Sequence, residues 1–278
     1  MQSWVQTYLH HLQQTLQQPS RTYLRQLMRA HLAVFPFENF HKLTRAPHEQ
    51  PDELLGDPET FLQAHETAHA GGTCFSLNMN FGRLLEALNF SVGWISPGGW
   101  HTALIVTDPE NPRVLWYVDV GTGAPMFQPV SFTGRRTDVP SFAGEKVFFL
   151  PTGELGSYAY IRAQEGKLLE RKWTFSVYDT KQQAELMPAA RASFHPEATF
   201  LNELRCERKL PEQRKVLLLK DRWFIIRTSA GARLERELRS KEEGAAVIAN
   251  EMKCEKLAPA YLQAVEHMAQ NGVDIFPR

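Results

Sequence analysis

Hydrophobic residues recur at helical spacing through the first part of the chain. Trp4, Tyr8 and Leu12 fall on one face of a helix. A second apolar run follows Ser20, a residue type that commonly caps a helix N-terminus. Further helical runs continue to about residue 88, so the pattern predicts a helical bundle over residues 1–88.

The pattern then changes to short alternating runs rich in Val, Ile and aromatic residues. They are separated by Pro and Gly clusters at the spacing typical of an antiparallel sheet or barrel, and they read "SVGWIS", "HTALIVT", "VLWYVDV", "KVFFL" and "WTFSVYD". We predict a central antiparallel β-barrel over residues 89–180, then a helical connector over 181–209. Residues 210–278 combine strand and helical runs, which indicates a C-terminal α/β segment. The expected fold class is α+β.

Composition and charge narrow the possible partners. The chain has 278 residues, of which 43% are hydrophobic, enough to fill a sizeable core. It has 31 Lys and Arg residues and 31 Asp and Glu residues, so no net charge favours nucleic acid or an anionic membrane surface. We expect a small-molecule partner. The sequence has no apolar run of membrane-spanning length, and three widely spaced cysteines suit a reducing compartment, so we predict a cytoplasmic protein.

One stretch, "HETAHAGGTCFSLN", supports two chemical interpretations. His65 and His69 match the HExxH pattern of zinc peptidases. A catalytic zinc site needs a third protein ligand, and the position that supplies it in one variant is Phe75, which cannot bind zinc. Glu86, 17 residues after His69, is the other candidate, but a Gly-Gly break intervenes. We therefore favour a structural role for the two histidines and predict no metal site.

The second half of that stretch places Cys74 at the start of a helix. Leu77, Phe81 and Leu84 form an apolar stripe after it, and Thr73 stands at the capping position. Unpaired N–H groups in the first helical turn would favour a thiolate and an adjacent oxyanion. Cysteine is also a common buried hydrophobe. The helix alone thus leaves inert packing and catalysis equally open.

A histidine and an aspartate lie in a predicted hairpin. The loop "DPENP" separates two strand runs, and pairing that is symmetric about Glu110 places His101 directly opposite Asp119. Opposed side chains are close enough for the carboxylate to orient the imidazole, which could then accept a thiol proton. A cysteine, a histidine and an aspartate are the parts of an activated thiol nucleophile. A structural His–Asp pair within a sheet remains the alternative.

Taken together, four motifs resemble the arylamine N-acetyltransferase family. The family patterns are RGGxCFExN, H-x-x-L-x-V, VDVGFG and AHL…VPFEN, and the stretches here are "AGGTCFSLN", "HTALIV", "VDVGTG" and "AHLAVFPFEN". The resemblance extends over most of the chain. It implies the order helical bundle, barrel and α/β lid, so that residues 210–278 form the lid.

The resemblance also implies a mechanism. Cys74 would be the nucleophile, His101 its base and Asp119 the orienting carboxylate of a papain-like triad. Acetyl-CoA, a cosubstrate rather than a bound cofactor, would acylate the cysteine, and an arylamine, hydrazine or related amine would then take the acetyl group in a ping-pong reaction. The residues expected to contact substrate are Phe37, Gly72, Thr73 and Thr122.

This sequence departs from the family at three positions. Ala70 replaces the Arg before Gly-Gly, Ser76 replaces a Glu, and Thr122 replaces the aromatic residue of the aspartate turn. Two alternatives remain open. One is an amide-forming acyltransferase with a carrier-bound donor, like the amide synthases related to this family. The other is a degenerate member that binds ligands without turnover, which the changes at Ala70 and Ser76 motivate. A zinc peptidase is the weakest alternative.

Loss of the family Arg also leaves Glu38 in need of a partner, because a buried carboxylate without one is costly. We expect His69 or Arg83 to take that place.

Other residues carry weaker signals. Charged neighbours predict that Cys206 and Cys254 are surface or half-buried thiols without a role. Trp100, Trp116 and Trp173 are predicted to belong to the core. The sequence does not predict an oligomeric state.

Overall fold

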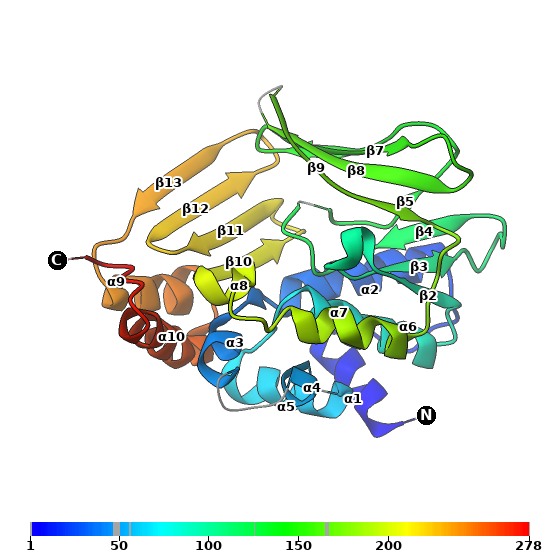
Figure 1. Cartoon of the computed structure of the whole chain (residues 1–278). Helices are drawn as coiled ribbons and strands as arrows, with labels where there is room; N and C mark the ends of the chain where they lie inside the picture. Colours follow the sequence, from blue (N-terminus) through cyan, green and yellow to red (C-terminus); the bar gives the residue numbers. More distant parts are fainter. Residues whose placement is uncertain (1, 47–50, 56, 125, 165–166, 278) are drawn as a thin grey trace.

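A computed structural model describes residues 2–46, 51–55, 57–124, 126–164 and 167–277. The predicted N-terminal helices are present along one side of the molecule (Figure 1). They are α1 (Ser3–His11), α2 (Arg21–Val34), α3 (Phe40–Arg45), α4 (Pro51–Leu55), α5 (Pro58–Ala68) and α6 (Cys74–Ala87).

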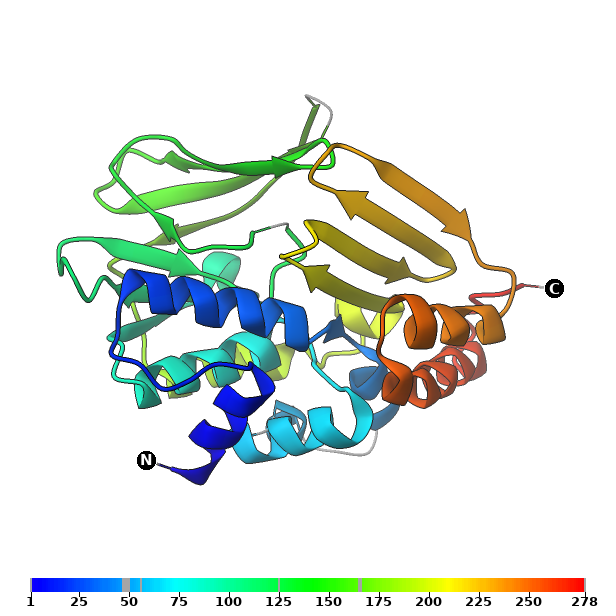
Figure 2. The same cartoon turned by 180° about the vertical axis from the view of Figure 1, so that it is seen from behind.

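Side chains at the helix starts explain where two of these helices begin. The Ser20 hydroxyl accepts a hydrogen bond from the Tyr23 amide at 3.1 Å, as the sequence predicts for α2. The Asp57 carboxylate accepts one from the Thr60 amide at 2.9 Å at the start of α5. Apolar faces of α1, α2, α5 and α6 then pack into one core beneath the first sheet (Figure 2).

The strands of the described residues form three antiparallel sheets. The first has the order β2-β3-β4-β5, with β2 (Val92–Ile95), β3 (Ala103–Thr107), β4 (Leu115–Val118) and β5 (Val130–Ser131). The second has the order β6-β7-β8-β9, with β6 (Thr137–Phe142), β7 (Glu145–Pro151), β8 (Ser157–Gln164) and β9 (Lys167–Ser176). The third has the order β1-β10-β11-β12-β13, with β1 (Phe37–Glu38), β10 (Arg205–Leu210), β11 (Lys215–Lys220), β12 (Trp223–Thr228) and β13 (Arg233–Glu237).

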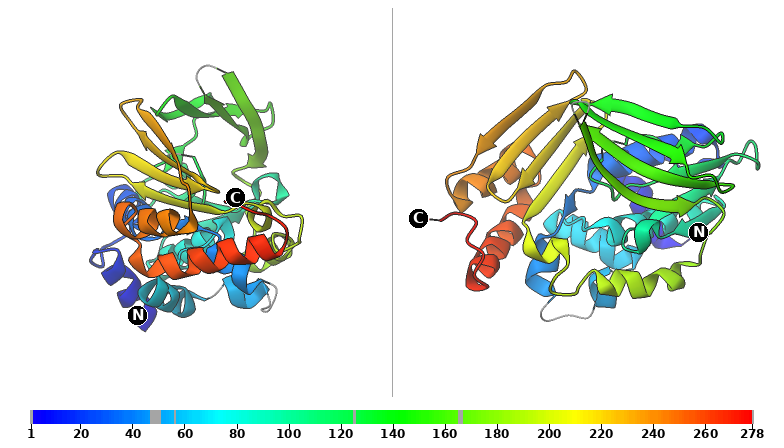
Figure 3. Two further views of the ribbon diagram at one scale, coloured as in Figure 1. Left: turned by 90° about the vertical axis from the view of Figure 1, so that its left-hand side faces the viewer. Right: turned by 45° about the horizontal axis from the view of Figure 1, so that its top comes forward.

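The prediction of a central β-barrel is wrong. The described strands pair within three separate sheets, and the second and third sheets lie as distinct layers (Figure 3). Closure of a barrel requires its edge strands to pair at a consistent tilt and stagger, and alternation of hydrophobic residues along single strands does not specify that. The mixed α and β content is confirmed.

The N-terminal and C-terminal parts of the chain share a sheet. Strand β1 pairs with β10, and Phe37 and Glu38 lie opposite Glu207 and Cys206. Along the chain between the second and third sheets, α7 (Met187–Ala192) and α8 (Thr199–Asn202) form the connector region, which lies beside the N-terminal helices (Figure 1). Helices α9 (Lys241–Ala246) and α10 (Ala258–Gln270) cover the third sheet. The domain boundaries at residues 88, 180 and 209 stay a prediction.

Burial corrects two predictions about single residues. Cys206 and Cys254 are both fully buried in the core between the third sheet and α10. The immediate neighbours of Cys206, Arg205 and Glu207, point to the opposite face of β10, and Arg208 on the same face donates to Cys254 within that core. Trp100, by contrast, is 56% exposed, whereas Trp173 is buried and Trp116 is half-buried. Within the described parts of the chain, the helices are too short or too polar to cross a membrane.

The packing of α6 against the first sheet generates a test. A Cβ atom at Gly82 would lie 2.3 Å from Cη2 of Trp94, so Gly82→Ala should destabilise the fold by about 1–3 kcal/mol although alanine favours helix. Urea unfolding measures the loss. In a Trp94→Phe background the clashing ring atoms are gone, and the same Gly82→Ala change should then cost less than in wild type; an equal cost would contradict this explanation.

Candidate active site

Cys74 is the first residue of α6, and a tightly packed turn positions it. Gly72 has φ +119°, a backbone conformation that glycine adopts readily. A Cβ atom at Gly71 would lie 1.8 Å from the Pro36 carbonyl oxygen, so only glycine fits there. The Glu38 amide donates to the Gly72 carbonyl at 3.0 Å. Strand β1 therefore fixes the loop that carries the cysteine.

Thr73 occupies the predicted N-cap position of α6. Its backbone is extended, as capping residues usually are, but its hydroxyl makes no capping hydrogen bond among the described residues. The prediction of Thr73 as the N-cap residue is confirmed, but the hydrogen bond expected from its side chain is not formed.

His101 and Asp119 meet in the folded protein. The His101 Nε2 atom lies 2.7 Å from Asp119 Oδ2, and both side chains are buried. The predicted register is wrong, because Leu104 lies opposite Val118, which would place Asp119 against Ala103. The Asp108 amide donates to the Val114 carbonyl at 2.9 Å, so the hairpin is centred on Asn111 instead of Glu110.

The pairing survives the register shift because both residues lie just beyond the strand ends. Strand β3 begins at Ala103 and β4 ends at Val118. His101 and Asp119 thus extend from the adjoining loops, where the ladder does not fix the direction of the side chains.

Further donors surround the Asp119 carboxylate. Tyr117 donates its hydroxyl at 2.9 Å, Asn78 its amide at 3.0 Å, and Gly121 its backbone N–H at 3.0 Å. Burial raises the pKa of Asp119, but the His101 charge and these hydrogen bonds outweigh it and hold the pKa below its usual range. The carboxylate is therefore ionised and oriented at neutral pH.

Asn78 ties the cysteine helix to both loops. It lies one turn after Cys74, donates to the Thr102 carbonyl at 2.8 Å, and accepts from the Val120 amide at 2.9 Å. We did not predict this role for Asn78 from the sequence, although the residue falls within the "CFSLN" motif. Its signal is the spacing of four from Cys74, which places both residues on one helix face.

The electrostatics of His101 indicate a protonated imidazole. Burial lowers the pKa of His101, but the charge and hydrogen bond of Asp119, together with a hydrogen bond and charge from Cys74, raise it to about 10. The ring also stacks on Trp173, with centroids 4.7 Å apart and planes 15° apart. With Nε2 directed to Asp119, the Nδ1 atom is the nitrogen left for the cysteine.

Cys74 and His101 open onto a cavity of about 610 Å³, a size typical of small-molecule sites. Asp119 lies behind His101 and outside this lining, and Gly72 instead borders a neighbouring cavity of about 70 Å³. The lining of the larger cavity includes Phe37, Thr73, Cys74, His101, Thr122 and Trp173. The structure thus brings most of the sequence-predicted residues to one site.

A comparison with family profiles shows to which protein family the chain belongs. The N-acetyltransferase profile matches residues 22–255, which is most of the chain. The chain belongs to the arylamine N-acetyltransferase family. It is an acetyltransferase, and a comparison with curated protein sequences finds no match.

Solved structures of arylamine N-acetyltransferases share this fold. The Salmonella typhimurium enzyme has 20% identity and a TM-score of 0.74, covering 94% of this chain and 99% of its own. The Mycobacterium marinum enzyme in complex with CoA has 20% identity and a TM-score of 0.76, covering 97% and 99%. The Nocardia farcinica enzyme has 20% identity and a TM-score of 0.72, covering 94% and 92%.

Glu38 of this acetyltransferase has a partner that we did not predict. Its carboxylate lies 3.0 Å from His41 Nδ1 and accepts from the Phe40 amide at 2.7 Å. Burial raises the pKa of Glu38, but the charge and hydrogen bonds of His41 prevail and lower it. The expectation of His69 or Arg83 is therefore wrong. His41 can contact Glu38 because it follows only three residues later and α3 begins directly after β1.

The HExxH stretch does not present two histidines on one helix. Helix α5 ends at Ala68, and His69 has the left-handed φ of 50°. The His65 Nδ1 atom lies 2.9 Å from the Ala70 carbonyl oxygen, and Glu86, the candidate third ligand that the sequence analysis disfavoured, accepts from the Trp94 indole at 3.1 Å. Across the described ranges, His, Cys, Asp and Glu form no group of three that could hold a metal ion.

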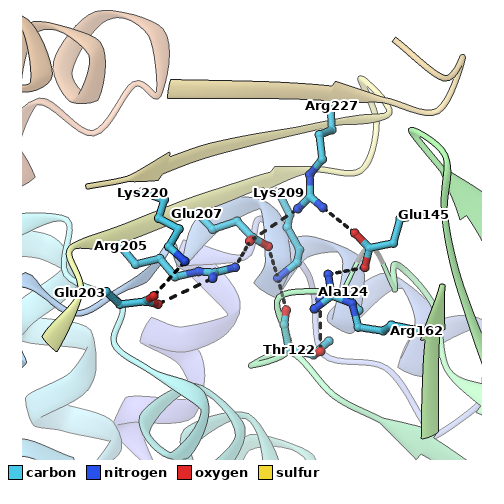
Figure 4. A network of polar contacts seen from close by, with 10 residues as sticks. All are labelled: Thr122, Ala124, Glu145, Arg162, Glu203, Arg205, Glu207, Lys209, Lys220 and Arg227. Carbon is cyan, nitrogen blue, oxygen red and sulfur yellow. Dashed lines mark hydrogen bonds and ion pairs between the residues drawn. The ribbon is translucent and has the colours of Figure 1, made fainter. Parts of the chain in front are cut away.

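A buried charge network supports the loop that follows Asp119 (Figure 4). Lys209 donates to the Thr122 carbonyl at 2.6 Å and lies 3.1 Å from the Glu207 carboxylate. Arg227 lies 3.7 Å from Glu207 and 2.7 Å from Glu145, so it joins the third sheet to the second. Burial raises the pKa of Glu207, but Lys209 and its other cationic neighbours lower it to about 2.

The close approach at Gly121 generates a prediction. A Cβ atom there would lie 2.6 Å from Cys74 Cα and 2.7 Å from Asn78 Nδ2, so Gly121→Ala should push the aspartate loop away from α6. We expect acetyl transfer to fall at least about tenfold, because misplacement of catalytic groups by about 1 Å can cost that much or more. Gly123→Ala is the matched control, since its Cβ would lie 2.8 Å from the end of the Arg205 side chain and 3.7 Å from the Glu207 carboxylate, and neither residue belongs to α6. Equal losses in the two variants would contradict the prediction.

His101 also predicts a pH dependence of stability. Its pKa in the folded protein, about 10, exceeds the ordinary value of 6.5. The stabilisation is therefore fully present below pH 6.5 and lost as the pH rises through about 10. The difference in unfolding free energy between wild type and His101→Gln should shrink across that window in urea titrations. A difference that stays constant or grows with pH would exclude a protonated His101.

Proposed function

We propose that this acetyltransferase moves an acetyl group from acetyl-CoA to an amine through a thioester on Cys74. The observation that carries the proposal is the contact of the buried His101–Asp119 pair with a cysteine that opens onto a substrate-sized cavity. In this proposal Cys74, His101 and Asp119 form a papain-like triad, and the reaction follows ping-pong order.

In the first half-reaction the Cys74 thiolate attacks the carbonyl carbon of acetyl-CoA. The new S–C bond gives a tetrahedral intermediate, and its collapse breaks the bond to the CoA sulfur. CoA leaves with a proton from the His101 imidazolium, which the raised pKa of His101 makes available. Asp119 stabilises the imidazolium and holds its orientation.

In the second half-reaction the amine attacks the Cys74 thioester. A C–N bond forms, the C–S bond to Cys74 breaks, and His101 accepts the proton that the amine loses. The imidazolium and thiolate are thereby restored. Backbone N–H groups in the first turn of α6 are suitable donors to the oxyanion, since a helix N-terminus leaves them unpaired.

For the acceptor we propose an arylamine, a hydrazine or a related amine. Phe37 and Phe200 line the cavity in an edge-to-face pair with centroids 5.1 Å apart, and they would contact a flat ring. Sequence analysis missed Phe200. Thr122 would contact substrate with less stacking surface than an aromatic residue, and Gly72 and Thr73 would shape the loop beside the reacting carbonyl.

Two of the three departures from the family motif lie away from this arrangement. Ala70 and Ser76 border the small cavity of about 70 Å³ beside Glu38, and neither of them contacts the His101–Asp119 pair. This supports a catalytic member of the family over a degenerate one. A CoA complex of a structural neighbour supports acetyl-CoA as the donor. We further propose a cytoplasmic location, because the three cysteines are unpaired.

Intact-mass spectrometry tests the proposal. Acetyl-CoA alone should add one acetyl group to the wild-type protein, and a panel of arylamines and hydrazines should then remove it as the acetylated amine. The Cys74→Ser variant should show no labile acetyl group, whereas Cys206→Ser, at a buried thiol outside the cavity, should behave as wild type. An unchanged mass after incubation with acetyl-CoA would overturn the proposed donor.

A further inference from the structure

Lys42 is a buried cation in the cavity that contains Cys74. It lies on α3, its exposed fraction is 8%, and it lines both this cavity and the small cavity beside Glu38. Its ammonium group donates to the Ser193 hydroxyl at 3.1 Å and lies 4.2 Å from the centre of the Phe194 ring. Both partners are uncharged, so neither balances the charge of the ammonium group.

The other cations that line this cavity are paired with acids. Arg162 contacts the Glu145 carboxylate, and Arg205 lies 3.1 Å from Glu207 (Figure 4). Among the described cationic side chains of the lining, Lys42 alone has no carboxylate within 4 Å. Glu38, four residues earlier in the chain, is directed to His41 instead.

A buried ammonium group that no carboxylate balances is costly unless another anion compensates its charge. Transfer of an ammonium group into a protein interior carries a penalty of several kcal/mol when no opposite charge is present. Burial lowers the pKa of Lys42 to about 8, and the nearby Cys74 opposes that shift, so the ammonium group is still mainly protonated at neutral pH. It is therefore available to an anion that enters the cavity.

We propose that Lys42 recognises a carboxylate carried by one of the two substrates, either the amine acceptor or the acyl group of the thioester donor. The inference rests on the proposed function, because it concerns the selectivity of that site. The cavity of about 610 Å³ accommodates a ring with an acidic substituent or an extended acyl chain. The other acids of the lining do not preclude this, since Glu203 is paired with Lys220 at 3.1 Å and Glu197 is exposed.

The acceptor arm of the test uses pairs of amines that differ only in charge. We compare 3- and 4-aminobenzoate with 3- and 4-aminobenzamide, using acetyl-CoA as donor, and measure kcat/KM. The wild type should prefer the carboxylate of at least one pair. Lys42→Met should lower kcat/KM for that carboxylate about tenfold and change the amide less than about twofold, because a charge-assisted hydrogen bond is lost. Lys42→Arg should retain most of the preference.

The donor arm uses acyl groups of equal chain length. Succinyl-CoA carries a terminal carboxylate and butyryl-CoA a methyl group, and the rate of Cys74 acylation by each is followed by mass spectrometry. A loss confined to succinyl-CoA in Lys42→Met would assign the carboxylate to the acyl group. Lys146→Met, at an exposed lysine on β7, is the matched control and should change neither ratio.

Three outcomes would overturn the proposal: no wild-type preference for the carboxylate in either arm, an unchanged preference in Lys42→Met, or an equal loss for charged and neutral substrates. Lys42→Gln replaces Lys42→Met if the latter fails to fold.

Calorimetric binding of the aminobenzoate and aminobenzamide pairs to unacylated protein needs no turnover. If the protein binds aminobenzoate more tightly than aminobenzamide in a way that depends on Lys42, but transfers no acyl group, the proposed function is wrong and the carboxylate site is supported. Acyl transfer without charge preference would do the reverse.

Discussion

The structure depends on the close contact between the start of α6 and the loop after β4. Gly121 lies directly against the Cys74 backbone, and the Asn78 amide bonds to the histidine loop and the aspartate loop at once. These contacts bring three residues that are distant in sequence to one point. The site therefore belongs to the junction of a helix and a sheet, and neither element could form it alone.

Buried charge is balanced around this junction by short contacts. Asp119 is satisfied by His101, Tyr117 and two amide donors, and Glu207 by lysine and arginine side chains from its own sheet. Lys209 connects this network to the loop after Asp119 through its hydrogen bond to the Thr122 carbonyl. Because the network also includes Glu145 on β7, the relative placement of two sheets is coupled to the loop that follows the aspartate. Lys42 is not part of this network and contacts no carboxylate of the described residues, which is the basis of the recognition role that we propose for it.

The departures from the family motif have local consequences. The space next to Ala70 and Ser76 is a small cavity, and His41 contacts the acid that the missing arginine would otherwise meet. A histidine three residues after the glutamate can do this because the chain turns into α3 at once. The loop that carries Cys74 thus keeps its support from β1, and the altered positions change the surroundings of the site without separating its parts.

The sequence determined the helices, the strands and the identity of the chemical groups. Apolar periodicity predicted α2 and α6, the capping role of Ser20 and the hairpin of β3 and β4, because these depend on interactions between residues near in sequence. The tertiary structure decided how the edge strands pair, so three sheets form in place of a barrel. It also decided that His101 and Asp119 meet from loops despite a shifted register, and that Cys206 is buried. Such outcomes depend on which distant surfaces pack together, and the local pattern of a chain does not specify that.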